Sequence, residues 1–92
     1  MQRLAIMAAG RVQGVGYRFF VEDKAERYAL TGWVRNCSNG SVELEAQGLA
    51  ADLQQFCDDL KEGPPAALVT GLQITELPVI QEEKEFGIRH SC

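Results

Sequence analysis

Gly10-Arg11-Val12-Gln13-Gly14-Val15-Gly16-Tyr17-Arg18 joins a short apolar segment to an amphipathic one. Glycine gives the backbone conformations that other residues avoid, so this stretch predicts a strand that turns sharply into a helix. Such a junction can bind an anion, because successive N–H groups converge at the positive end of the helix. Arg18, in the first helical turn, would add a guanidinium suited to two oxygens of that anion. A glycine-rich turn followed by a surface arginine would give the same pattern without a ligand.

Outside this junction, the periodicity of the apolar residues alternates between strand and helix. It predicts strands over residues 3–9, 31–37, 41–47, 68–75 and 86–89, and helices over 17–29 and 49–62. Asn39-Gly40 predicts a hairpin between the second and third strands. The order βαββαβ places two helices on one face of a four- to five-stranded antiparallel sheet. This is the α+β, ferredoxin-like sandwich.

The third strand separates the two faces of this sheet. Val42, Leu44 and Ala46 are expected to face the helices, and Glu43, Glu45 and Gln47 the open side. Acidic side chains on the open face would repel phosphates, which argues against an RNA-recognition module. The acidic segment 82–85, between the last two strands, is expected to be a solvated loop.

Composition narrows the class of protein further. The 92 residues suit one domain, residues 1–92, and the net charge of −4 argues against nucleic-acid or anionic-membrane partners. No apolar run could span a bilayer and no signal-peptide pattern opens the chain, so we expect a small cytoplasmic protein, monomeric by default. Cys37, Cys57 and Cys92 form no recognisable metal-ligand pattern with the single His90. We therefore expect free thiols and no metal or other cofactor.

A second motif follows the first at a defined distance. It consists of Gly32-Trp33-Val34-Arg35-Asn36 and then Asn39-Gly40-Ser41-Val42-Glu43. The two motifs, in this order and separation, resemble the acylphosphatase family, small enzymes that hydrolyse the carboxyl–phosphate bond of acyl phosphates. The first matches the family's Gly-x-Val-Gln-Gly-Val-x-aromatic-Arg pattern, and the second its Gly-aromatic-Val-x-Asn pattern. With the closing Phe86-Gly87-Ile88-Arg89, the resemblance covers nearly the whole chain.

The resemblance implies a small-molecule acyl phosphate as substrate and inorganic phosphate as product. The implied phosphate-binding loop is Gln13, Gly14, Val15, Gly16, Tyr17 and Arg18. Arg18 would hold the phosphoryl oxygens, and the Asn36 amide would orient the attacking water. The substrate phosphate itself would accept the proton of that water, which agrees with the absence of histidine and carboxylate from residues 10–18 and 32–36. Cys37 stands where the family often has a hydroxyl or small polar residue.

Each of these residues also has a purely structural interpretation. Asn36 could cap the hairpin together with Asn39, and Gln13 could hydrogen-bond the loop rather than substrate. Tyr17, Phe19 and Phe20 are expected to be core or core-edge aromatics, Trp33 a packing residue, Cys57 a core-edge residue and His90 an exposed one. An activated thiol at Cys37 is not expected, because no histidine lies near it in sequence. The alternative function is a non-catalytic anion-binding or regulatory module on the same fold.

Overall fold

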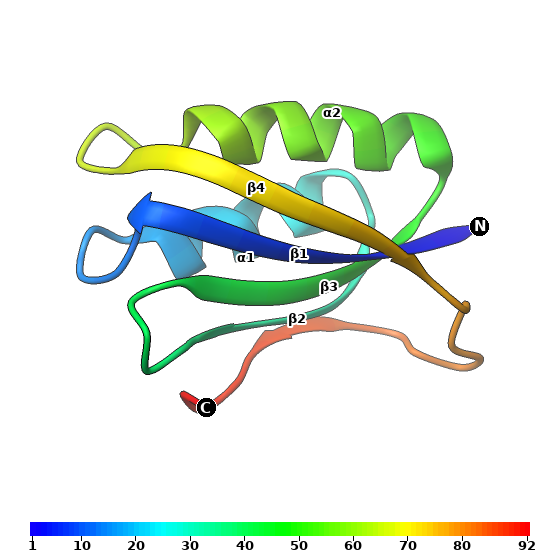
Figure 1. Ribbon diagram of the computed structural model, residues 1–92. Coiled ribbons are helices and arrows are strands. Elements are labelled where there is room, and N and C mark those ends of the chain that lie inside the picture. The colour runs from blue at the N-terminus through cyan, green and yellow to red at the C-terminus, as the bar shows by residue number, and fades with distance from the viewer.

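The computed structural model describes residues 1–92, which form five strands and two helices (Figure 1). The strands are β1 (Gln2–Arg11), β2 (Thr31–Asn36), β3 (Val42–Gly48), β4 (Leu68–Leu77) and β5 (Phe86–Ile88). The helices are α1 (Tyr17–Arg27) and α2 (Ala50–Glu62). Every predicted element is present, and the predicted order βαββαβ is confirmed.

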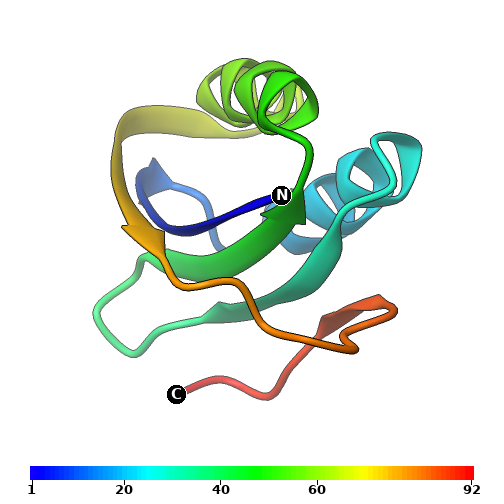
Figure 2. The same cartoon turned by 90° about the vertical axis from the view of Figure 1, so that its right-hand side faces the viewer.

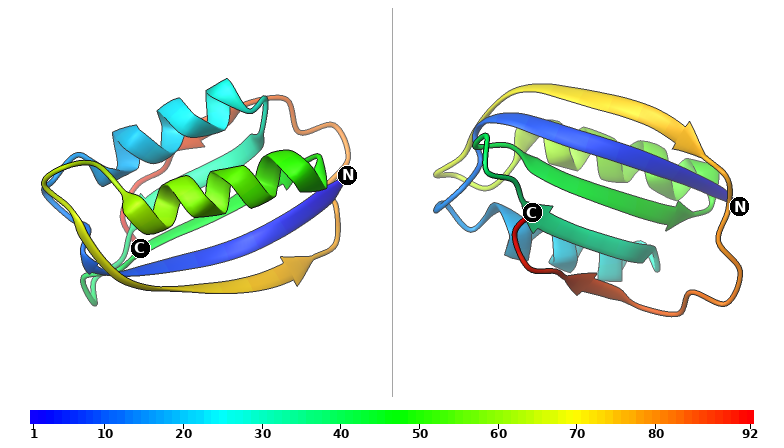
Figure 3. Two further views of the ribbon diagram at one scale, coloured as in Figure 1. Left: turned by 90° about the horizontal axis from the view of Figure 1, so that it is seen from above. Right: turned by 60° about the horizontal axis from the view of Figure 1, so that its bottom comes forward.

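All strands belong to one sheet, in the order β4-β1-β3-β2-β5. The first four are antiparallel as predicted, but β5 runs parallel to β2, so the sheet is mixed. Residues 78–85 carry the chain from β4 across one end of the sheet to the far edge (Figure 3). A strand that starts from that end must run opposite to β4, which is the direction of β2.

Both helices lie on the same face of the sheet, and the core fills the space between the two layers (Figures 2 and 3). The predicted inward residues Val42, Leu44 and Ala46 are all buried in this core. Each helix turns one face toward this core. Its buried residues recur every four positions in α1 and every three or four positions in α2, as expected for an amphipathic helix. These residues are Tyr17, Val21 and Ala25 from α1, and Leu53, Phe56, Cys57 and Leu60 from α2. Neither helix has the length and apolar character needed to cross a membrane.

The crossing segment 78–85 is more than the solvated loop predicted for residues 82–85. Arg3 points out of β1 on the open face and is almost wholly buried there. Its guanidinium donates to Glu83 Oε1 at 2.8 Å and to Glu45 Oε1 at 2.8 Å. Gln47 exchanges two hydrogen bonds with the backbone of Ile80, each 2.9 Å long. A buried arginine requires charged partners, and these contacts fix the segment against the sheet.

Two glycines near the predicted site are required for different reasons, one in strand β1 and one in the β2–β3 hairpin. At Gly10 a Cβ would come within 2.2 Å of the Leu68 carbonyl oxygen, so the close approach of β1 and β4 excludes any side chain. In the β2–β3 hairpin the amide of Gly40 donates to the Cys37 carbonyl, and Gly40 has φ of 90°. This is a turn closed by a left-handed residue, as the Asn39-Gly40 pair predicts.

Candidate active site

The two sequence motifs meet at one end of the sheet. The loop between β1 and α1 and the hairpin between β2 and β3 both lie at the left of Figure 1. Between them is a cavity of about 240 Å³. Its lining consists of Val12, Gly14, Gly16, Tyr17, Arg18, Phe19 and Asn36. The fold therefore brings Arg18 and Asn36 to the same cavity, although they are far apart in the sequence.

The loop from Gln13 to Gly16 leaves its N–H groups free. None of them donates to another backbone group. Gly14 and Gly16 have φ of 74° and 80°, which an L-residue adopts only with strain. Gly16 also precedes α1 without any side-chain cap, so the N–H groups of the first helical turn have no capping partner. Such a loop offers several convergent donors and the positive end of a helix to an anion.

Arg18 lies in the first turn of α1 and is half-buried beside the cavity. It forms no ion pair with a carboxylate of the protein, whereas Arg3, Arg27 and Arg35 each form at least one. Its guanidinium is therefore available to an anion in the cavity.

Asn36 is the last residue of β2 and shares the helix-facing side of the sheet with Val34. Its Oδ1 atom is buried and has no hydrogen-bond partner. The alternative that Asn36 caps the hairpin is wrong. Asn39 performs that task, since its Oδ1 accepts from the Ser41 amide at 3.1 Å and from the Ser41 hydroxyl at 2.6 Å. A buried amide oxygen without a hydrogen-bond partner costs about 1–3 kcal/mol of stability. Buried polar atoms almost always have a partner, so the Asn36 oxygen needs an explanation.

The other two members of the predicted loop do not line the cavity. Gln13 turns away from it, and its Nε2 donates to the carbonyl oxygens of Cys37 at 2.7 Å and Ser41 at 2.8 Å. The structural interpretation placed these hydrogen bonds within the loop itself, but the side chain instead joins the loop to the β2–β3 hairpin. Val15 packs against the hydrophobic core.

The aromatic residues of the first motif have three different environments. Tyr17 is buried, its hydroxyl donates to the Leu60 carbonyl at 2.9 Å, and burial raises its pKa. Phe20 packs against the core. Phe19 was predicted to be a core or core-edge aromatic, and this is wrong, because 67% of it is exposed at the edge of the cavity. The helical period separates the two residues, because Phe20 lies three positions after Tyr17 on the buried side of α1, whereas Phe19 lies two positions after it and off that side.

The cysteines are free, and Cys37 is not an activated thiol. Burial raises the pKa of Cys37, and a hydrogen bond with the Cys92 thiol raises it further. Cys92 is held nearby, because its amide donates to the Asn36 carbonyl at 3.0 Å. Cys57 is buried at the edge of the core as predicted, and His90 is exposed. No group of three or more His, Cys, Asp or Glu side chains is arranged to hold a metal ion.

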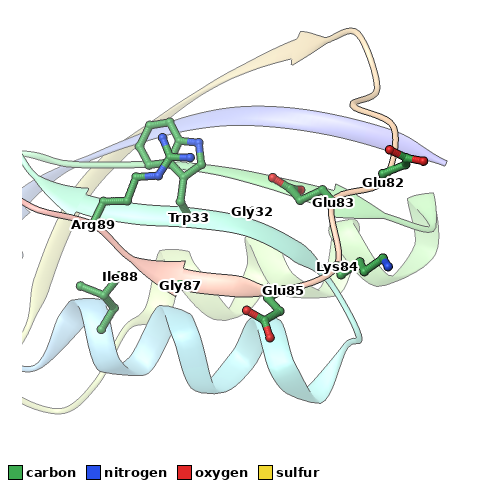
Figure 4. Close-up of a pocket in the computed structure, with 9 residues that line it drawn as sticks. All are labelled: Gly32, Trp33, Glu82, Glu83, Lys84, Glu85, Gly87, Ile88 and Arg89. Atoms are coloured by element: carbon green, nitrogen blue, oxygen red, sulfur yellow. The ribbon is translucent and has the colours of Figure 1, made fainter.

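A wider hollow lies on the opposite side of β2, around Trp33 (Figure 4). Trp33 is buried as a packing residue, and the guanidinium carbons of Arg35 and Arg89 lie 5.0 Å and 4.7 Å from the centre of its ring. Glu82, Glu83 and Glu85 line the same hollow. Lys84 and Arg89 also line it, so the acidic side chains outnumber the basic ones there, whereas the cavity of Arg18 and Asn36 has no acidic side chain.

The family model described as Acylphosphatase matches residues 4–88. An acylphosphatase from Clostridium beijerinckii is 41% identical over 90 residues, which cover 98% of this chain and 100% of the relative. The crystal structure of acylphosphatase from Bacillus subtilis superposes with a TM-score of 0.93 at 39% identity, covering 97% of this chain and 99% of that one. The structure of full-length HypF in the phosphate- and nucleotide-bound form matches with a TM-score of 0.89 at 38% identity, over 98% of this chain but 12% of that one. The match over both motifs and nearly the full length shows that this chain belongs to the acylphosphatase family.

Proposed function

We propose that this acylphosphatase hydrolyses the carboxyl–phosphate bond by direct in-line attack of water, without a metal ion or other cofactor. The observation that carries the proposal is the buried, unpartnered Oδ1 of Asn36 in the cavity that also receives Arg18. A polar atom left in this state at a cleft is explained by a ligand that completes its hydrogen bonding.

The phosphoryl group would lie in the loop. Its oxygens would accept from the free N–H groups between Gln13 and Arg18 and, in bidentate fashion, from the Arg18 guanidinium. These donors supply positive potential exactly where phosphoryl transfer develops negative charge on the equatorial oxygens. The overall charge of −4 would repel an anionic substrate, so the attraction has to be local.

Asn36 would position the nucleophile. Its Oδ1 accepts a hydrogen bond from the attacking water, and its Nδ2 can donate to a phosphoryl oxygen. An amide is a poor base, and no histidine or carboxylate lines the cavity. The proton of the water therefore passes to a phosphoryl oxygen of the substrate. The P–O bond to the acyl group breaks, and the products are a carboxylate and inorganic phosphate.

The same reasoning limits the substrates. A carboxylate is a weak base and leaves without protonation, whereas an alkoxide needs a general acid that the cavity does not contain. We propose small-molecule acyl phosphates as substrates and phosphate monoesters as poor ones. We propose that the protein acts in the cytoplasm as a monomer, and the net charge of −4 argues against a nucleic-acid partner.

The test is hydrolysis of acetyl phosphate by the purified protein in the presence of EDTA, with an alkyl phosphate as the comparison substrate. Turnover of acetyl phosphate that is insensitive to the chelator is expected, with little turnover of the monoester. Loss of activity in EDTA that a divalent ion restores would overturn the metal-free scheme. Phosphate binding without any turnover would support the non-catalytic module instead.

A further inference from the structure

The cavity has one apolar side chain that is free to meet a ligand. Of the residues that line it, Val12 and Tyr17 are each 99% buried, so they have almost no surface left to offer, while Phe19 is 67% exposed. Phe19 has no stacked aromatic and no cationic partner, in contrast to Phe20, which stacks on Tyr17 and lies under Lys24. A single exposed phenylalanine is ordinary on a protein surface. Phe19 differs because it borders the cavity that holds Arg18 and Asn36.

The rest of the lining leaves few partners for the acyl group of a substrate. Gly14 and Gly16 offer backbone alone, and Arg18 and Asn36 are assigned to the phosphoryl group and the water. No other charged side chain lines the cavity, and the Tyr17 hydroxyl is already donated to Leu60. A charged or strongly hydrogen-bonding acyl group would lose water without gaining a partner. An aromatic or extended apolar acyl group could instead cover the Phe19 ring.

We propose that Phe19 determines substrate specificity by contacting the acyl group, and that it favours acyl phosphates with an aromatic or extended apolar acyl group. This inference rests on the proposed function. Phe19 and Arg18 line the same cavity, so the acyl substituent of a phosphoryl group held by Arg18 is within reach of the ring. The ring would touch the acyl group and not the phosphorus or the attacking water. The contact should therefore strengthen substrate binding and change KM more than kcat.

The test compares kcat/KM for benzoyl phosphate and acetyl phosphate in the native protein and in Phe19→Ala. With benzoyl phosphate a loss of about 5- to 10-fold is expected, the amount that corresponds to uncovering one face of a ring. The loss should lie mainly in KM. With acetyl phosphate, whose methyl group is too short to cover the ring, kcat/KM should stay close to the native value. Phe19→Leu, which keeps an apolar side chain, should lose less than Phe19→Ala.

Two controls distinguish a change in substrate specificity from a general loss of activity. The inhibition constant for inorganic phosphate should be unchanged in Phe19→Ala, because the loop and Arg18 remain. Leu49→Ala removes another apolar side chain that is 60% exposed, at the start of α2 and the opposite end of the sheet, and should leave the ratio of the two substrates unchanged. Equal loss on both substrates, or no loss on either, would overturn the role of Phe19 while the proposed hydrolysis still stands. Failure of the native protein to turn over either substrate would overturn the proposed function itself.

Discussion

The side-chain amide of Gln13 donates a hydrogen bond of 2.7 Å to the carbonyl oxygen of Cys37. Gln13 opens the loop that leads to Arg18, and Cys37 directly follows Asn36. The same Nε2 atom also donates to the Ser41 carbonyl at 2.8 Å, across the hairpin. One side chain therefore joins the segment that would bind the phosphoryl group to the segment that would position the water.

Gln13→Ala should loosen the connection between these two segments without removing any side chain that lines the cavity. We expect kcat to fall by about 10- to 100-fold, the effect of a small misplacement of groups that must be aligned. The free energy of unfolding should fall by about 1–3 kcal/mol, from two hydrogen bonds lost. The measurements are steady-state kinetics and urea unfolding, with the exposed Gln55→Ala on α2 as the control. Native kcat in a folded Gln13→Ala protein would contradict the positioning role.

The sequence could predict that the two motifs meet, because their meeting depends only on the order of the strands in the sheet. Because β1 and β2 both end beside the start of β3, any chain of this topology brings residues after Ala8 and residues around Asn36 together. The meeting of Arg18 and Asn36 therefore follows from local periodicity and two turns. Their chemical roles stay predictions, which the variants below test.

The features that sequence missed depend on long-range contacts. Arg3 and Glu83 are separated by 80 positions, and no periodic pattern reports that such residues form a pair. The parallel direction of β5 follows from the crossing segment that this pair fixes. Phe19 is a different case, because it lies two positions after Tyr17 and outside the periodic stripe of Tyr17, Val21 and Ala25, so the helical pattern itself places it away from the core.

Glu83→Gln should make the protein less stable at neutral pH and remove part of its sensitivity to acid. Burial opposes ionisation of Glu83, but hydrogen bonds from Arg3 outweigh it and the pKa lies below the ordinary value. A lowered carboxyl pKa stabilises the fold above the unfolded-state pKa, and this contribution is lost as the pH falls through the folded-state pKa.

At neutral pH we expect Glu83→Gln to lower the free energy of unfolding by about 1–3 kcal/mol. The difference from native protein should shrink in acid. Urea unfolding at several pH values measures this. Glu82→Gln, at an exposed neighbour without an ion pair, is the matched control. A constant difference at all pH values would show that the charge of Glu83 is not responsible.

Cys37→Ser should retain most of the activity. The pKa of Cys37 is raised by burial and by its contact with Cys92, so at neutral pH the thiol is protonated and a poor nucleophile. Alkylation followed by mass spectrometry should modify exposed Cys92 first, and Cys37 only as the pH rises. Cys57→Ser and Cys92→Ser are the companion variants. Abolition of turnover in a folded Cys37→Ser protein would indicate covalent thiol catalysis and would displace Asn36 from its role.

Arg18→Ala should lose phosphate binding together with activity. Hydrogen bonds to charged groups contribute about 1.5–3 kcal/mol each, so removal of a bidentate contact should weaken phosphate binding by roughly 10²–10⁴. The measurement is the inhibition constant of inorganic phosphate in acetyl phosphate hydrolysis, or direct calorimetry if turnover is too slow. Arg27→Ala, in the last turn of the same helix and paired with Asp23, is the control for the loss of a positive charge. Normal phosphate binding by Arg18→Ala would refute its role.

Asn36→Ala should separate activity from stability. The variant leaves the phosphate loop intact and removes a group that acts as the water attacks, so kcat should fall by about 10²–10³ while phosphate inhibition stays near native. The same substitution removes a buried oxygen that has no partner, so the free energy of unfolding should be unchanged or higher. Kinetics and urea unfolding on one preparation measure both. A variant that is less active because it is less stable would indicate that Asn36 holds the hairpin, and a fully active one would show that another group positions the water.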